Sequence, residues 1–205
     1  MPISHKHKVI FVHIPKSGGS SIEYSLGIYA KNSHGDNTIV DDEILFGHDL
    51  QHLPMCSITS RLGEELTKNY FKFAIVRNPW DRMVSEYFWR AGWNIDHNKV
   101  SFYDFLSEYP SSNTGCAHFK PQVEFIYNSI SDKNYDRCLV DFVGRFESLH
   151  EDFKKICGLA GIENVSLPKV NSSSRSSYRD YYDDRSIQIV RELYQQDINL
   201  FGYKF

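Results

Sequence analysis

Short apolar runs alternate along the chain with segments whose apolar residues have helical spacing. The runs Val9–Val12 and Phe71–Val76, and another within Cys138–Glu147, are rich in β-branched and aromatic residues. Such runs, without polar alternation, are typical of buried parallel strands. Helical spacing is found at about Ile22–Leu26, Ser60–Tyr70, Trp80–Arg90, Phe102–Tyr109, Ser148–Leu159 and Asp184–Asn199. The alternation predicts a three-layer α/β fold, with a central parallel sheet of about four to five strands and helices on both faces.

Length and charge narrow the class of protein. The chain has 205 residues, which predicts a single domain over residues 1–205, and we find neither an internal repeat nor a linker. Its net charge of −3 argues against a nucleic-acid partner. The polar segment Met1–Lys8 lacks the apolar middle of a signal peptide, and no run is long enough to span a membrane. We therefore expect a soluble, cytoplasmic protein. Its four cysteines form no Cys-x-x-Cys pair, which favours free thiols over disulfides or a metal site.

The turn that follows the first strand has the composition of an anion site. Pro15 stops the strand, and Gly18 and Gly19 allow a tight turn that brings backbone N–H groups close to a ligand. The expected helix begins just after the turn, where unpaired N–H groups and the helix dipole favour an anion. The side-chain donors are Lys16, Ser17, Ser20 and Ser21. A phosphate or sulfate group is the natural ligand.

A second candidate anion site follows the strand Phe71–Val76. Arg77 comes directly after this strand, and Asn78-Pro79 is a good helix start. Ser85 lies two turns into the expected helix, so that Arg77 and Ser85 can face one anion. The alternative is an arginine that pairs with Asp81 or Glu86 on a solvated face.

A histidine follows another short apolar run. Glu43–Phe46 is a candidate strand, and Gly47-His48 comes directly after its end. Ligands of α/β sheets lie outside the carboxyl ends of the strands, which makes His48 a candidate for chemistry. His52 follows four residues later, on the same face of a helix if one forms there. Without a third ligand nearby, a metal site is not predicted.

The first turn resembles the 5′-phosphosulfate loop of sulfotransferases that use 3′-phosphoadenosine 5′-phosphosulfate (PAPS). The order His13-Ile14-Pro15-Lys16-Ser17-Gly18-Gly19-Ser20-Ser21 is most similar to the Golgi-type carbohydrate sulfotransferases and their bacterial relatives. It is P-loop-like, but it is not a Walker A motif, because Lys16 precedes the glycines.

Three later segments also resemble this family. Val76–Tyr87 resembles the 3′-phosphate motif, in which an arginine and a serine have the spacing of Arg77 and Ser85. Gly144–Glu147 and Asp197–Tyr203 resemble two further family segments. The resemblance therefore spans most of the chain.

The resemblance implies a reaction and roles for individual residues. PAPS would donate its sulfuryl group to an acceptor hydroxyl, that of a saccharide or glycoconjugate, without a metal ion. Lys16 would stabilise the charge on the leaving oxygen, and His48 would take the proton of the acceptor. His52, His13 and His118 are the alternatives for this base. The cofactor-binding residues would be Lys16, Ser17, Gly18, Gly19, Ser20, Ser21, Arg77, Ser85 and Arg175, the last from a loop that closes over the nucleotide in related enzymes.

Two other functions fit the same residues. One is a P-loop-type small-molecule kinase, although the Gly-Lys-Ser/Thr order and a clear magnesium carboxylate are missing from the sequence. The other is a non-catalytic nucleotide-binding module. Gln122 is a further candidate for contacting the acceptor, because family members often carry a glutamine here; the alternative is an exposed polar residue. The chain lacks the membrane anchor and stem of Golgi members, which again predicts a cytoplasmic enzyme.

Overall fold

The computed structural model describes residues 3–28, 39–40, 43–44, 51–91, 95–96, 98–129, 135–163, 165–168 and 175–205. They divide into two compact units, and the chain passes between the units three times. The first unit is Met1–Val76 with Glu124–Ser172, and the second is Arg77–Val123 with Ser173–Phe205. The turn around Lys16 belongs to the first unit, whereas Arg77, Ser85 and Arg175 belong to the second.

A four-stranded sheet is the centre of the first unit. Its strands, in spatial order, are β1 (Ile3–Ser4), β2 (Val9–Val12), β5 (Phe71–Val76) and β8 (Phe142–Arg145). The last three are parallel, and β1 pairs antiparallel with β2 at the edge. Val12 lies beside Ala74, and Val76 beside Arg145, so the carboxyl ends of the parallel strands share one edge of the sheet. The predicted α/β fold is confirmed.

Apolar burial explains why these segments became strands. All four residues of β2 are buried, as are the last four of β5. The ring of Phe11 stacks on that of Phe73 in the neighbouring strand, with 5.0 Å between centroids. Cross-strand aromatic pairs of this kind stabilise the register as well as the core.

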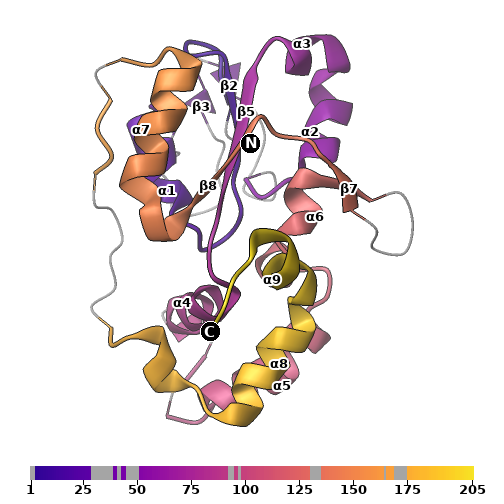
Figure 1. The fold of residues 1–205 in the computed structure, drawn as a ribbon, viewed down its shortest axis with the longest axis vertical. Coiled ribbons are helices and arrows are strands. Elements are labelled where there is room, and N and C mark those ends of the chain that lie inside the picture. Colours follow the sequence, from indigo (N-terminus) through magenta and orange to yellow (C-terminus); the bar gives the residue numbers. More distant parts are fainter. Residues whose placement is uncertain are drawn as a thin grey trace. The chain divides into compact units, whose positions relative to one another are not determined.

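Helices cover both faces of this sheet (Figure 1). The helices of the first unit are α1 (Gly19–Ser25), α2 (Met55–Leu62), α3 (Glu64–Lys68) and α7 (Leu149–Ala160), with the short η3 (Phe146–Ser148) before α7. Helices α1 and α7 lie to one side of the sheet, and α2 and α3 to the other (Figure 1). The prediction of one helix over Ser60–Tyr70 is wrong, because Gly63, with a φ of 84°, separates α2 from α3.

Two small antiparallel sheets lie apart from the main one. They pair β3 (Ile39–Val40) with β4 (Glu43–Ile44), and β6 (Tyr127–Ser129) with β7 (Tyr135–Cys138). The expected strand Glu43–Phe46 is thus represented by β4, which does not join the central sheet. Helix α6 (Val123–Ile126) leads the chain back from the second unit into the first.

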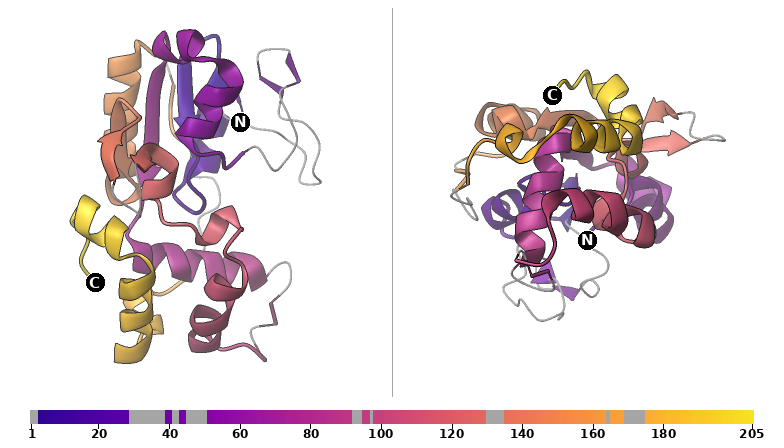
Figure 2. Two further views of the ribbon diagram at one scale, coloured as in Figure 1. Left: turned by 90° about the vertical axis from the view of Figure 1, so that its right-hand side faces the viewer. Right: turned by 90° about the horizontal axis from the view of Figure 1, so that it is seen from below.

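The second unit is helical. Its elements are α4 (Pro79–Ala91), α5 (Phe102–Ser112), η2 (Ala117–Phe119), η4 (Tyr178–Tyr181), α8 (Asp184–Leu193) and α9 (Gln195–Phe201). Helix α4 runs crosswise to α5 and α8 (Figure 2, left). It begins where predicted, because Asn78 Oδ1 accepts a hydrogen bond from the N–H of Trp80 at 3.0 Å. The single final helix that we predicted is two helices, with Tyr194 between them.

The interior of the second unit contains charged side chains as well as aromatic ones. The guanidinium of Arg82 is fully buried, donates from Nη2 to the carbonyl of Lys120 at 2.8 Å, and lies 4.9 Å from the ring centroid of Tyr194. Asp197 is also fully buried. Within the described residues, no helix has both the length and the apolar character needed to cross a bilayer.

Candidate functional site

The turn between β2 and α1 has an unusual backbone. Lys16 has a φ of 64° and Gly18 a φ of 83°, which places both in the left-handed region. A non-glycine residue rarely adopts this conformation, and such residues are concentrated at functional sites. Because α1 has only seven residues, we assign the anion-binding capacity to the peptide groups of the turn rather than to a long helix dipole.

A buried hydroxyl lies in this turn. Ser17 is 1% exposed, and its Oγ has no hydrogen-bond partner among the described residues. A buried hydroxyl without a partner is costly, so this donor fits a ligand oxygen better than it fits a packing role. Ser20 is half-buried and Ser21 is buried at the start of α1. The turn carries an ammonium, peptide N–H groups and serine hydroxyls, and its role as an anion site stays a prediction.

His13 supports the turn from below. Its Nδ1 lies 2.6 Å from Oε1 of the buried Glu23, whose Oε2 accepts a hydrogen bond from Gln51 at 2.8 Å. Its ring packs so closely on Gly19 that a Cβ there would lie 2.1 Å from Nε2. No side chain fits at position 19 beside the ring of His13, so glycine is required there. His13 packs under the turn and stabilises it.

His52 packs against His13, the histidine beneath Gly19. Its Nδ1 donates to the carbonyl oxygen of His13 at 2.9 Å, and the two rings meet edge to face at 4.5 Å. His48, our first choice for the base, lies outside the described residues. Its role stays a prediction.

Two arginines of the second unit share one carboxylate. Arg77 contacts Asp81 Oδ2 with Nε at 2.9 Å and Nη2 at 2.8 Å. Arg175 contacts the other oxygen, Oδ1, with Nη2 at 2.5 Å. The two arginines that we predicted from separate segments are thus brought together. Arg77 does pair with Asp81, but this pair is largely buried and not on the solvated face that we considered as the alternative. Two guanidinium groups on one carboxylate leave a net positive charge, and Nη1 of Arg175 is buried without a hydrogen-bond partner among the described residues.

The third predicted residue of this site lies on the same helix. Ser85 is half-buried in α4, one turn after Asp81. Residues four apart lie on one face of a helix, so Ser85 is on the helix face that carries Asp81.

Gln122 has a role that sequence reasoning missed. It is fully buried rather than exposed. Its Oε1 accepts a hydrogen bond from the N–H of Arg77 at 2.8 Å, and its Nε2 donates to the carbonyl of Arg77, also at 2.8 Å. Asp197 in turn accepts hydrogen bonds from the N–H groups of Gln122 and Val123, both at 2.9 Å. The sequence signal was that family members often carry a glutamine at this position, which gives no hint that it pairs with Arg77.

Comparison with known proteins identifies the family. The structure is that of an α/β protein in which basic and hydroxyl side chains gather in two separate groups, one around Lys16 and one around Arg77. The family model described as "Sulfotransferase family" matches residues 1–204, and the chain belongs to this family. The predicted family resemblance is confirmed.

Relatives and a solved structure agree with this assignment. Carbohydrate sulfotransferase 10 of Xenopus laevis is 24% identical, and that of Homo sapiens is 23% identical; each alignment covers 98% of this chain and 66% of the relative. An uncharacterized protein of Archaeoglobus fulgidus is 26% identical over 62% of this chain and 98% of its own length. The crystal structure of mouse sulfotransferase SULT7A1 complexed with PAP has a TM-score of 0.52 at 15% identity, covering 96% of this chain and 86% of that one, and shows the likeness of fold. This chain thus spans slightly less than two thirds of the carbohydrate sulfotransferases that it matches.

Proposed function

We propose that this chain transfers a sulfuryl group from PAPS to an acceptor hydroxyl, which a saccharide provides. Membership of the sulfotransferase family supports the reaction type. Carbohydrate sulfotransferase 10 from several vertebrates is among the relatives, which supports the saccharide. The mouse relative of known structure holds PAP, adenosine 3′,5′-bisphosphate, which is what PAPS becomes when it loses its sulfuryl group.

One observation carries the choice of nucleotide: the pairing of Arg77 and Arg175 with Asp81. This group has an excess positive charge, and Arg175 has a buried N–H that lacks a partner among the described residues. Arginine is well suited to phosphate, because its planar guanidinium offers parallel N–H donors. In our proposal the group binds the 3′-phosphate, which distinguishes PAPS from ATP, and Ser85 adds a hydroxyl.

The turn around Lys16 would bind the other end of the nucleotide. Its peptide N–H groups, Ser17, Ser20 and Ser21 would bind the 5′-phosphosulfate. The acceptor oxygen attacks sulfur, the bond from sulfur to the bridging oxygen breaks, and its electron pair stays on the phosphate of PAP. Lys16 stabilises this developing charge, as preorganised cations do in other transfer reactions. His48 takes the proton of the acceptor.

A pair of binding measurements tests the nucleotide. PAP should bind and raise the melting temperature, since a ligand that binds only the folded state stabilises it. ATP with magnesium should bind more weakly by calorimetry. Tighter binding of ATP would support the kinase instead. An acceptor screen with labelled PAPS then tests catalysis, and binding of PAP without transfer to any acceptor would favour the non-catalytic module.

A further inference from the structure

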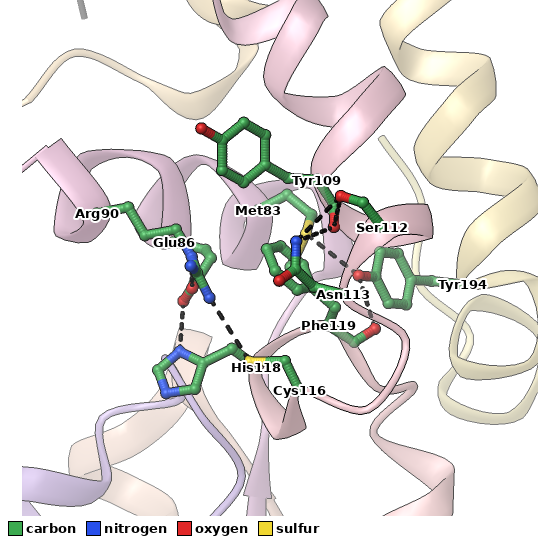
Figure 3. A network of polar contacts seen from close by, with 10 residues as sticks. All are labelled: Met83, Glu86, Arg90, Tyr109, Ser112, Asn113, Cys116, His118, Phe119 and Tyr194. Carbon is green, nitrogen blue, oxygen red and sulfur yellow. Dashed lines mark hydrogen bonds and ion pairs between the residues drawn. The ribbon is translucent and has the colours of Figure 1, made fainter. Parts of the chain in front are cut away.

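A histidine held by a carboxylate of helix α4 lies in the second unit. Figure 3 shows His118 and Arg90 converging on Glu86 from two different segments. Nδ1 of His118 lies 2.7 Å from Oε2 of Glu86, and Nε of Arg90 donates to Oε1 at 2.7 Å. Nη2 of Arg90 also contacts Sγ of Cys116 at 3.6 Å. Both oxygens of a fully buried carboxylate are thus satisfied.

The ionisation of Glu86 determines which nitrogen of His118 carries the proton. Burial opposes ionisation, but the hydrogen bond and charge of His118, together with those of Arg90, outweigh it and lower the pKa of Glu86. A carboxylate only accepts hydrogen bonds, so Nδ1 of His118 is the donor. In the neutral ring the basic nitrogen is then Nε2, and the carboxylate fixes both the tautomer and the orientation of the ring.

An exposed indole lies against this imidazole. The rings of Trp89 and His118 are stacked, with 4.7 Å between centroids and 22° between planes. Trp89 remains 37% exposed, and the His118 side chain 15% exposed. Buried polar groups that only join two segments have no need of an exposed aromatic ring stacked on them. An aromatic surface beside a few oriented polar groups is instead the usual composition of a ligand site.

The position of Trp89 on α4 relates this surface to the proposed nucleotide site. Asp81, Ser85 and Trp89 are spaced four residues apart, so they form one stripe along the helix. The stripe begins at the arginine pair, continues through the proposed 3′-phosphate hydroxyl, and reaches the indole one turn later. A ligand on Trp89 is therefore a neighbour of Ser85 on the same helix face.

We propose that Trp89 and His118 form a binding site for the saccharide acceptor. The apolar face of a pyranose ring packs on the indole, and Nε2 of His118 accepts a hydrogen bond from a sugar hydroxyl. Glu86 and Arg90 act through His118 and do not touch the saccharide. This site rests on the proposed function for the identity of its ligand, and it concerns binding of the acceptor rather than removal of its proton.

The test is a titration with defined saccharides, in the absence and in the presence of PAP. The probes are methyl glycosides of galactose, N-acetylglucosamine and glucuronic acid, and an unsulfated chondroitin hexasaccharide. The indole ¹⁵N–¹H signal of Trp89, assigned by its loss in Trp89→Phe, should shift on binding of at least one probe. Trp89→Ala should weaken that probe by about fivefold or more, in line with the loss of an aromatic stacking surface.

His118→Asn separates binding from structure. Asparagine keeps an N–H close to the position of Nδ1, so Glu86 retains a donor, but it has nothing at the position of Nε2. We expect a melting temperature close to that of the wild type, together with weaker saccharide binding. The matched control is Tyr103→Ala, which removes another exposed aromatic ring of the same unit, 42% exposed, and should leave saccharide affinity unchanged.

The outcomes are distinct. Normal saccharide affinity in both Trp89→Ala and His118→Asn would overturn the proposal, as would failure of every probe to bind the PAP-loaded wild type. The affinity for PAP should be the same in all these variants. If the wild type does not bind PAP at all, the proposed function fails, and saccharide shifts of the Trp89 signal would then still establish the site on its own.

Discussion

The side-chain amide of Gln122 pairs with the main chain of Arg77 as a neighbouring strand would. One hydrogen bond runs to each side of the amide, and both are 2.8 Å long. Arg77 comes directly after the last residue of β5, where its pairing in the sheet has ended. Gln122 therefore satisfies the peptide groups of Arg77 and holds the residue in position to present its side chain to Asp81.

Replacement of Gln122 by methionine should separate positioning from simple stability. Methionine has similar length but neither donor nor acceptor, so the N–H and C=O of Arg77 are left buried without their present partner. Each such group costs about 1–3 kcal/mol, and the melting temperature should fall. The affinity for PAP should fall about tenfold or more, while that for adenosine 5′-monophosphate, which lacks the 3′-phosphate, should change little. Calorimetry with both nucleotides measures how far Gln122→Met lowers each affinity.

The matched control is Gln188→Met, which removes an exposed glutamine on α8 of the same unit. It should change the affinity for neither PAP nor adenosine 5′-monophosphate. If Gln122→Met weakened the binding of both nucleotides equally, Gln122 would stabilise the fold in general and would not specifically position Arg77.

The two arginines on Asp81 should act on the same part of the nucleotide. Arg77→Ala and Arg175→Ala should each weaken PAP by about one to two powers of ten, the range of a charge-assisted hydrogen bond. Neither should affect adenosine 5′-monophosphate to that extent. Because both contact Asp81, their effects should not add, and a double-mutant cycle measures the coupling. Equal losses for both nucleotides would place these side chains elsewhere than at the 3′-phosphate.

Glu86 should make the free energy of unfolding depend on pH. Its pKa is lowered in the folded state, so its contribution is complete above the unfolded pKa of about 4.3 and is lost as the pH falls through the folded value. Glu86→Gln cannot titrate, and its unfolding free energy should fall less steeply between about pH 5 and 3. Urea denaturation across that range measures the slope. The control is Glu64→Gln, which removes a carboxylate of an exposed ion pair with Lys68 and should keep the wild-type slope. A wild-type slope in Glu86→Gln as well would contradict a lowered pKa of Glu86 in the folded state.

The three parallel strands of the central sheet were predictable from sequence, whereas the short antiparallel β1 was not. Continuous apolar runs such as Val9–Val12 have few alternatives to a buried strand, and the glycines after Lys16 indicate a tight turn. The pairing of Arg175 with Asp81 was not predicted, because 94 residues separate the two and the family resemblance implied only that Arg175 contacts the nucleotide.

What sequence could not give is the role of polar residues that are buried by contacts distant in the chain. Gln122 reads as an exposed residue until its partners Arg77 and Asp197 are known. The same holds for His118, whose orientation depends on Glu86, 32 residues earlier. Local patterns indicate faces of helices and strands, but a hydrogen bond between distant segments leaves no periodic signal.

The two residues proposed for the chemical step, Lys16 and His48, should differ in their effects on the nucleotide. Lys16 contacts the donor in our proposal, so Lys16→Ala should lower turnover and also lower the affinity for PAP. His48 should contact only the acceptor, so His48→Ala should leave PAP affinity nearly unchanged and reduce turnover by about 10²–10⁴-fold, the range for a lost general base.

The pH dependence of turnover distinguishes His48 from the other histidines. In the wild type, kcat/KM should fall toward acid pH as the base becomes protonated, with a midpoint near the usual histidine pKa of about 6.5. His48→Ala should lack that limb, whereas His118→Asn should keep it and show mainly a raised KM for the saccharide. His52→Ala is the informative comparison, because its ring is held on His13 beside the Lys16 turn. Near-normal turnover in His48→Ala with a lost acid limb in His52→Ala would transfer the role of base to His52.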